Sequence, residues 1–265
     1  MPQKDELKYI SKTKRVLSDS DSWDVLLSVY NSSERVQKVF DSIRASFKIW
    51  IITPEYGYLS NEHPTVFGSG QVIELKKSDE SEQIHEVFDN LSIALDDKKI
   101  LIDITGMMRP QILFLLKFLN QKGIKGFDMI YTEPLSYEKK EHTKFNLSNI
   151  SAVRQVEGFQ GGDLTDQPTI LIVGAGYDYG QSSRVVLEKE GAYLINILNL
   201  PSLSADMYQE SLLCLERADL VSKQKELHFV NANDPYITAF YLCKIYKKIK
   251  AMHQRFNLYL SPLST

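Results

Sequence analysis

Short apolar segments alternate with amphipathic segments along most of the chain, and this alternation constrains the fold more than any other feature. The apolar segments, such as 49–53 and 100–105, are rich in isoleucine and leucine. The segments between them repeat apolar residues every three or four positions, which is the period of a helix packed on one face. Strands that alternate with helices predict parallel pairing, and continuously apolar strands predict sheets buried on both faces. The expected fold class is α/β, with Rossmann-like parallel sheets covered by helices.

The expected elements form two runs. The first run has strands at 23–30, 49–53, 72–75, 100–105 and 127–131, and helices at 33–43, 82–95 and 110–120. The second run has strands at 169–173, 192–198, 227–230 and 257–260, and helices at 181–190, 206–218 and 235–252. A polar, glycine-containing stretch separates the runs, and it allows a hairpin strand near 152–156. We therefore expect a Rossmann-like domain over 1–134, a connection over 135–167 and a second Rossmann-like half over 168–265.

Composition excludes several classes of protein. The net charge of -3 provides no overall positive field, so direct binding of nucleic acid is not favoured. Cys214 and Cys243 are far apart, which excludes a disulfide framework and a cysteine zinc site. The N-terminal residues lack the apolar core of a signal peptide, and no apolar run approaches the length of a membrane span. We expect a soluble cytoplasmic protein without a membrane partner. The last strand, 257–260, has no helix after it, which predicts a sheet edge or a partner there.

One segment between an expected strand and an expected helix is more specific than the rest: residues 103–110, with the sequence DITGMMRP. Ligands in open parallel sheets bind beyond the carboxyl ends of the strands, where this segment falls. Gly106 permits a tight turn and close approach of the backbone. Thr105, Arg109 and the N–H groups of the helix start can hold a phosphate. Asp103 lies in an apolar strand, so its carboxylate needs a partner, either as a helix cap or with Arg109.

The order of strand, D-x-T-G-x-x-[RK] and apolar helix resembles the ligand loop of CRISPR-associated Rossmann-fold (CARF) sensor domains. In that family a Thr-Gly-Gly-Thr-Lys-type loop contacts a cyclic oligonucleotide. The resemblance covers this loop with its flanking strand and helix. This chain has Met107 where a second glycine is typical, and Arg109 in place of the lysine. The resemblance implies that Thr105, Gly106 and Arg109 contact phosphate, and that the protein is a sensor or regulatory subunit in prokaryotic antiviral defence or stress response.

A second glycine-rich turn follows the first strand of the second half. Gly174 and Gly176 match the start of the dinucleotide fingerprint G-x-G-x-x-G, but position 179 is Tyr179 and the next strand ends without a carboxylate. A standard NAD site is therefore not expected. A generic phosphate loop and a plain strand-to-helix turn both stay open. The expected ligand contacts of this half are Gly174, Gly176, Tyr177 and Asn233.

The patterns of common enzyme classes are missing from the sequence. The five histidines show no HxH or HExxH spacing, and there is neither a G-x-S-x-G elbow nor a Walker A lysine. No metal is therefore expected. Carboxylates at strand tips, namely Asp103, Glu133 and Asp178, are the candidate catalytic groups, and such groups also serve as helix caps. A nucleotide-metabolising glycosidase or transferase is one alternative, and a structural subunit that binds no ligand is another.

The leading expectation is a protein that binds a nucleotide or a nucleotide-derived signal. Hydroxyl, amide and tyrosine side chains recur after almost every expected strand, and these groups suit ribose, phosphate and base. Local positive charge comes from Arg109 and from the run Lys244–Lys250, whose other interpretation is a solvated helix face. No cofactor beyond a nucleotide is assigned. The expected partners are a nucleotide-type small molecule and other protein chains, in a homo-oligomer or a larger complex.

Overall fold

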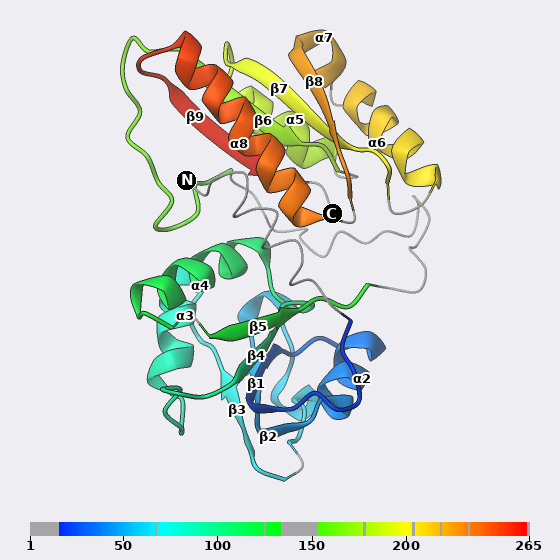
Figure 1. The fold of residues 1–265 in the computed structure, drawn as a ribbon, viewed down its shortest axis with the longest axis vertical. Helices are drawn as coiled ribbons and strands as arrows, with labels where there is room; N and C mark the ends of the chain where they lie inside the picture. Colours follow the sequence, from blue (N-terminus) through cyan, green and yellow to red (C-terminus); the bar gives the residue numbers. More distant parts are fainter. Residues whose placement is uncertain are drawn as a thin grey trace. The chain divides into compact units, whose positions relative to one another are not determined.

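The computed structural model describes residues 16–66, 68–124, 126–133, 153–176, 179–202, 205–217, 219–232 and 234–263. Within them the chain divides into two compact units. The first unit contains residues 17–133 together with 154–160, and the second contains residues 161–263 together with Val16 and Val153. Each unit is built around its own parallel sheet (Figure 1).

A five-stranded parallel sheet forms the centre of the first unit, in the order β3-β2-β1-β4-β5. The strands are β1 (Trp23–Val29), β2 (Ala45–Ile52), β3 (Gly70–Glu74), β4 (Ile100–Asp103) and β5 (Phe127–Ile130). The helices are α2 (Glu34–Ser42), α3 (Glu80–Asp89) and α4 (Arg109–Gln121), with short 3-10 helices η2 (Pro54–Tyr56) and η3 (Ser60–Glu62) after β2. Because β1 pairs with both β2 and β4, the strand order reverses its direction between β1 and β4.

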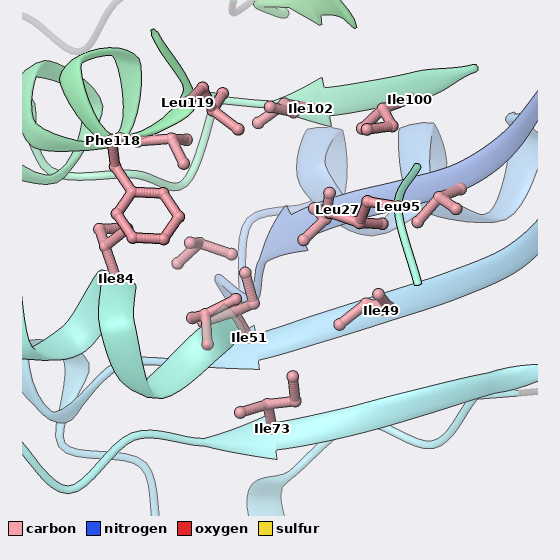
Figure 2. Packing of buried hydrophobic residues seen from close by; sticks show 14 of the residues in the cluster. Leu27, Ile49, Ile51, Ile73, Ile84, Leu95, Ile100, Ile102, Phe118 and Leu119 are labelled. Atoms are coloured by element: carbon pink, nitrogen blue, oxygen red, sulfur yellow. The ribbon is translucent and has the colours of Figure 1, made fainter. Parts of the chain in front are cut away.

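Both faces of this sheet are buried, as continuously apolar strands predict. On one face, strand side chains pack against α3 and α4 (Figure 2). Removing one such leucine or isoleucine side chain from water stabilises the fold by roughly 1.5–3 kcal/mol. The residues labelled in this cluster are Leu27, Ile49, Ile51, Ile73, Ile84, Leu95, Ile100, Ile102, Phe118 and Leu119.

The opposite face of the first sheet packs against α2. Leu26, next to Leu27 on β1, points to this side because successive strand residues alternate between faces. It joins Val36 and Phe40 of α2, and the Phe40 ring stacks on that of Trp50 with 3.6 Å between their centres. The apolar residues in 33–43 therefore recur with a helical period because they pack against this face of the sheet.

The second unit has a four-stranded parallel sheet in the order β8-β7-β6-β9. Its strands are β6 (Thr169–Gly174), β7 (Tyr193–Asn199), β8 (Gln224–Val230) and β9 (Asn257–Pro262). Its helices are α5 (Tyr179–Glu188), α6 (Ala205–Arg217), α7 (Leu220–Lys223) and α8 (Pro235–Met252). The buried residues of α8, Ile245 and Ile249, pack on one face of β6 and β7 (Figure 1). As in the first unit, the first strand lies between the second and the fourth.

The predicted α/β fold with two halves of parallel strands is confirmed. The helix expected over 82–95 is shorter, because it ends at Asp89, where the Asn90 side chain donates a hydrogen bond to the Glu86 carbonyl. Leu91 and Leu95 still pack into the same core from irregular chain, which explains why the apolar period continues. Residues 153–156 form no strand. β9 is the edge strand of the described sheet, one of the two outcomes expected for 257–260. No helix in the described parts of the chain combines the length and the apolar character needed to cross a membrane.

Candidate functional site

The carboxyl ends of β1 and β4 mark the point where the strand order reverses in the first unit, and open parallel sheets bind ligands at such points. The strands are parallel, so the segments after β1, β2, β4 and β5 meet at the same edge of the sheet. Side-chain contacts join these segments to one another. We call this group the switch-point site, and its residues are Tyr30, Asn31, Ser32, Arg35, Tyr56, Tyr58, Thr105, Gly106, Arg109, Tyr131 and Thr132.

Asp103, at the end of β4, is completely buried, and both of its carboxylate oxygens accept hydrogen bonds. Ser28 Oγ donates to Oδ2 at 3.0 Å, and the backbone N–H of Thr105 donates to Oδ1 at 2.9 Å. Ser28 is also fully buried, on the neighbouring strand β1. A carboxylate in such a place needs these partners. Asp103 thus closes the turn after β4 and joins it to β1. Of the two roles expected for this residue, these hydrogen bonds correspond to the local cap.

Gly106 is buried where the loop after β4 meets the end of β1. A Cβ atom at this position would lie 2.3 Å from the carbonyl oxygen of Val29, so no other residue fits without a backbone shift. The close approach expected for this glycine is therefore made to β1. The carbonyl of Gly106 accepts a hydrogen bond from Tyr56 Oη at 2.9 Å. Burial raises the pKa of the Tyr56 phenol, although a hydrogen bond with Asn31 acts in the opposite direction.

Thr105 joins the loop after β4 to the loop after β5. Its Oγ1 accepts a hydrogen bond from the backbone N–H of Thr132 at 3.0 Å, which leaves the hydroxyl proton free for another acceptor. The carbonyl of Thr132 in turn accepts a hydrogen bond from Arg35 Nη1 at 2.9 Å. Residues that follow β1, β4 and β5 are thereby linked in one hydrogen-bonded chain.

Two arginines lie in the first turns of the two helices at the switch-point site, and in α2 the arginine follows Glu34. Arg35 lies in the first turn of α2, and Arg109 is the first residue of α4. The Arg35 guanidinium lies 6.0 Å from the centre of the Tyr131 ring, and Tyr131 is 52% exposed. Desolvation lowers the pKa of Arg109 and the nearby Tyr131 acts to raise it, but a guanidinium stays protonated at neutral pH in either case. The site therefore presents two positive charges beside an exposed aromatic ring.

The backbone adds to this positive potential. Neither N-cap residue, Ser33 before α2 or Met108 before α4, closes its helix start with its own side chain. The N–H groups of a helix start carry partial positive charge and favour an anion. Both helices are long enough to have a developed dipole, and both begin at the edge where the strand order reverses.

Tyrosines line the side of the site that follows β1 and β2. The ring centre of Tyr58 is 5.0 Å from that of Tyr30 and 5.8 Å from that of Tyr56. The backbone N–H of Ser32 donates to Tyr58 Oη at 2.8 Å, which ties the two loops together. Rings held in this way can stack on a nucleobase.

A chain of buried amides holds the start of α4 from below. Gln111 Oε1 accepts a hydrogen bond from the backbone N–H of Met108 at 2.9 Å, and Gln111 Nε2 donates to Gln83 Oε1 at 2.6 Å. Gln83 Nε2 then donates to Glu55 Oε1 at 2.7 Å and to the carbonyl of Lys77 at 2.8 Å. Both glutamines are buried. The loop that carries Arg109 is thus supported by α3 and by the segments after β2 and β3.

Sequence reasoning located the loop after β4 but did not identify Arg35, Tyr30 or the two glutamines as part of the site. Arg35 had a usable signal, because like Arg109 it follows a strand and lies in the first turn of a helix. The glutamines had none, since an amide on an amphipathic helix is normally solvated. Only the packing of α3 against α4 buries them.

The residues expected to bind a ligand in the second half belong to the second unit. Gly174 ends β6, and its carbonyl accepts a hydrogen bond from the backbone N–H of Leu263 at 3.1 Å. Gly176 is buried. Tyr177, Asn233 and the candidate catalytic residue Asp178 lie outside the described residues. Of the other candidate catalytic groups, Asp103 has no exposed surface, whereas Glu133 is exposed after β5.

Neither the metal-ligating side chains of the described residues nor known relatives indicate a function. The described part of the chain contains no group of three or more His, Cys, Asp or Glu side chains placed to hold a metal ion. No family model matches the sequence, and neither a curated protein nor a solved structure is similar to it. Function is therefore inferred from the geometry and charge of the switch-point site.

Proposed function

We propose that the first unit binds a nucleotide or a nucleotide-derived signal at the switch-point site, as a sensor or regulatory subunit. The observation that carries this proposal is the pair Arg35, in the first turn of α2 after Glu34, and Arg109, the first residue of α4, in helices that follow the two strands between which the strand order reverses. Guanidinium groups match the geometry of phosphate oxygens, and helix starts add partial positive charge. A phosphate-bearing ligand is the class that this arrangement suits best.

The other groups of the site favour a nucleotide over a simple phosphate. Tyr58, with its neighbours Tyr30 and Tyr56, offers ring faces for a base, and the exposed Tyr131 offers another. The unused hydroxyl proton of Thr105 can donate to a phosphate or ribose oxygen. The resemblance of residues 103–110 to the CARF ligand loop supports a cyclic oligonucleotide as one such ligand, and with it a place in prokaryotic defence.

Two carboxylates near the switch-point site, Asp103 and Glu55, are engaged in hydrogen bonds inside the protein, which favours a structural role for them over a catalytic one. Both oxygens of Asp103 accept hydrogen bonds inside the protein, and Glu55 accepts one from Gln83. These carboxylates position loops. A general acid or base must reach the proton that it transfers, and fully buried Asp103 has no exposed surface from which to do so.

The test is calorimetric titration of the full chain with mononucleotides, dinucleotides, cyclic oligonucleotides and inorganic phosphate. At least one nucleotide should bind, and Arg109→Ala and Arg35→Ala should each weaken it by about tenfold or more, since a charged hydrogen bond contributes about 1.5–3 kcal/mol. Arg44→Ala is the matched control, because Arg44 is exposed on the chain between α2 and β2. The proposal fails if no nucleotide binds, or if the two variants bind as tightly as Arg44→Ala.

A further inference from the structure

Residues 154–160, which we call the strap, lie on the helices of the first unit and are held there by one buried carboxylate. This carboxylate is Glu80, the first residue of α3, which is 2% exposed. Arg154 donates to both of its oxygens, from Nη1 at 2.8 Å and from Nη2 at 2.5 Å. The backbone N–H of Glu157 donates to Oε1 at 2.9 Å. Bidentate pairs of arginine and carboxylate are among the strongest hydrogen-bonded contacts in proteins.

The ionisation of Glu80 is consistent with this role as an anchor. Burial acts to raise the pKa of Glu80, but the bonds from Arg154 and Glu157 hold it below its ordinary value. The bond to Glu80 raises the pKa of Arg154. The carboxylate and the guanidinium are therefore both charged in the folded protein at neutral pH.

Apart from this anchor, the strap is held loosely. None of its residues is buried, and Phe159 is 53% exposed. Lys117 of α4 contacts the carbonyl of Gly158 and lies 5.3 Å from the centre of the Phe159 ring. A segment with few buried apolar contacts opens locally at low free energy. Opening must, however, break the three hydrogen bonds that the strap donates to the Glu80 carboxylate. The contacts of one carboxylate therefore account for most of what holds the strap on the first unit.

Because the strap lies in the chain between the two units, its opening would change the length of chain that connects them. Residues 161–168 join the strap to β6, so the lock determines how much chain tethers the second unit to the first. An extended chain spans about 3.3–3.6 Å per residue, so the released residues 154–160 alone add up to roughly 25 Å to the tether, and the chain that precedes them adds more.

The anchor is connected to the switch-point site through the first turn of α3 and two hydrogen-bonded glutamines. Gln83 lies one turn after Glu80 on α3, and it bonds to Gln111, which holds the start of α4. The direction of both amides is determined, because the N–H of Met108 requires the oxygen of Gln111 and thereby turns its nitrogen toward Gln83. The first turn of α4 is thus joined to the first turn of α3 by side-chain hydrogen bonds.

We propose that the strap is a releasable lock on the tether between the two units, and that Gln83 and Gln111 couple this lock to the switch-point site. The ligand dependence of the coupling rests on the function proposed above, whereas the lock and its amide link do not. A phosphate that draws Arg109 and the start of α4 toward it displaces Gln111, and through Gln83 it changes how firmly Glu80 holds Arg154.

The test is hydrogen exchange of the full chain without ligand, read at the backbone N–H groups of Glu157 and Phe159. Arg154→Ala should raise exchange at Glu157 by about tenfold, the factor that corresponds to about 1.4 kcal/mol. Gln111→Met removes the amide at nearly constant side-chain length and should raise it several-fold. Gln121→Met is the matched control, because Gln121 is exposed at the end of the same helix. The exchange of Glu157 in Gln121→Met should match that of the wild type.

Slow exchange in β1 and β4 identifies the variants that keep their fold. If Gln111→Met does not fold, Gln83→Met tests the same hydrogen bond from its other partner. The lock is refuted if Arg154→Ala leaves the exchange of Glu157 unchanged. The coupling is refuted if Arg154→Ala raises the exchange but the folded glutamine variants match Gln121→Met. No ligand is present in the experiment, so its outcome is independent of whether nucleotides bind.

Discussion

The first and second units share a strand order, but they place different chemistry where that order reverses. In the first unit the loop after β4 is joined to neighbouring loops by side chains, and an arginine lies in the first turn of each adjacent helix. In the second unit the ends of β6 and β9 are joined through the backbone, from Leu263 N–H to the Gly174 carbonyl. There the start of α8 is closed by its own cap, Asp234, which accepts from the N–H groups of Tyr236 and Ile237.

Positive charge is also used differently in the two units. The lysines of α8 lie on the body of the helix, and two of them are engaged with neighbours. Lys248 donates to Glu226 at 2.8 Å, and the Lys244 ammonium lies 5.0 Å from the centre of the Phe240 ring. In the first unit Arg35 and Arg109 stand at helix starts. The comparison teaches that a shared topology determines where a ligand can bind, while the side chains at that edge determine whether it does.

The largest expected effect comes from adding one methyl group to the first unit. Gly106→Ala places a Cβ atom 2.3 Å from the Val29 carbonyl oxygen and should lower the free energy of unfolding by about 3 kcal/mol. Gly161→Ala in the second unit meets nothing within 4 Å and should change it little. Chemical denaturation measures both. Equal stability of the two variants would show that the loop after β4 does not need its close contact with β1.

A second prediction compares the buried polar residues of the two sheets. Asp103→Asn replaces an acceptor of two hydrogen bonds by an amide that turns its NH₂ toward one of the donors, and it should destabilise the protein by about 2–3 kcal/mol. On β7, Asn196 donates to Gln224 at 3.1 Å, but its oxygen has no hydrogen-bond partner among the described residues. Asn196→Leu should therefore cost less than about 1 kcal/mol. The comparison fails if the second change costs as much as the first.

A third prediction concerns where a nucleotide binds. If the switch-point site is the ligand site, Lys247→Ala and Lys250→Ala on α8 should leave the affinity for the bound nucleotide unchanged, while Arg109→Ala weakens it by about tenfold. Calorimetric titration at constant salt provides the affinities. A loss of binding in the lysine variants alone would move the site to the second unit.

The smallest predicted effect depends on pH. Because the pKa of Glu80 is lowered in the folded protein, the folded state holds fewer protons than the unfolded state in the acid range. The stabilisation from this carboxylate is therefore complete above its unfolded pKa of roughly 4.3 and is lost as pH falls through the lower folded value. The difference in the free energy of unfolding between wild type and Glu80→Gln should shrink as pH falls toward about 3, which is below the unfolded pKa. Glu82→Gln, on the exposed side of α3, should show no such trend in the same denaturation series.

The periodicity of the apolar residues was sufficient to predict both parallel sheets and most of their helices. It erred at the end of α3, because Leu91 and Leu95 continue the apolar period outside the helix. The loop after β4 was predictable because glycine, threonine and arginine follow an apolar strand. Arg35 could have been found by the same rule applied to the loop after β1.

Neighbouring residues along the chain were enough to predict which segments form strands and which faces of the helices are apolar, because both follow from the local period of apolar residues. The order of the strands was decided only in the tertiary structure, which brings β1 beside β4 and thereby Arg35 toward Arg109. The same holds for Gln83, Gln111 and Glu80, polar residues whose burial depends on α3, α4 and the strap packing together. From its neighbours along the chain alone, a polar side chain on a helix is expected to be solvated. Only distant segments of the chain can supply the partners that make its burial stable.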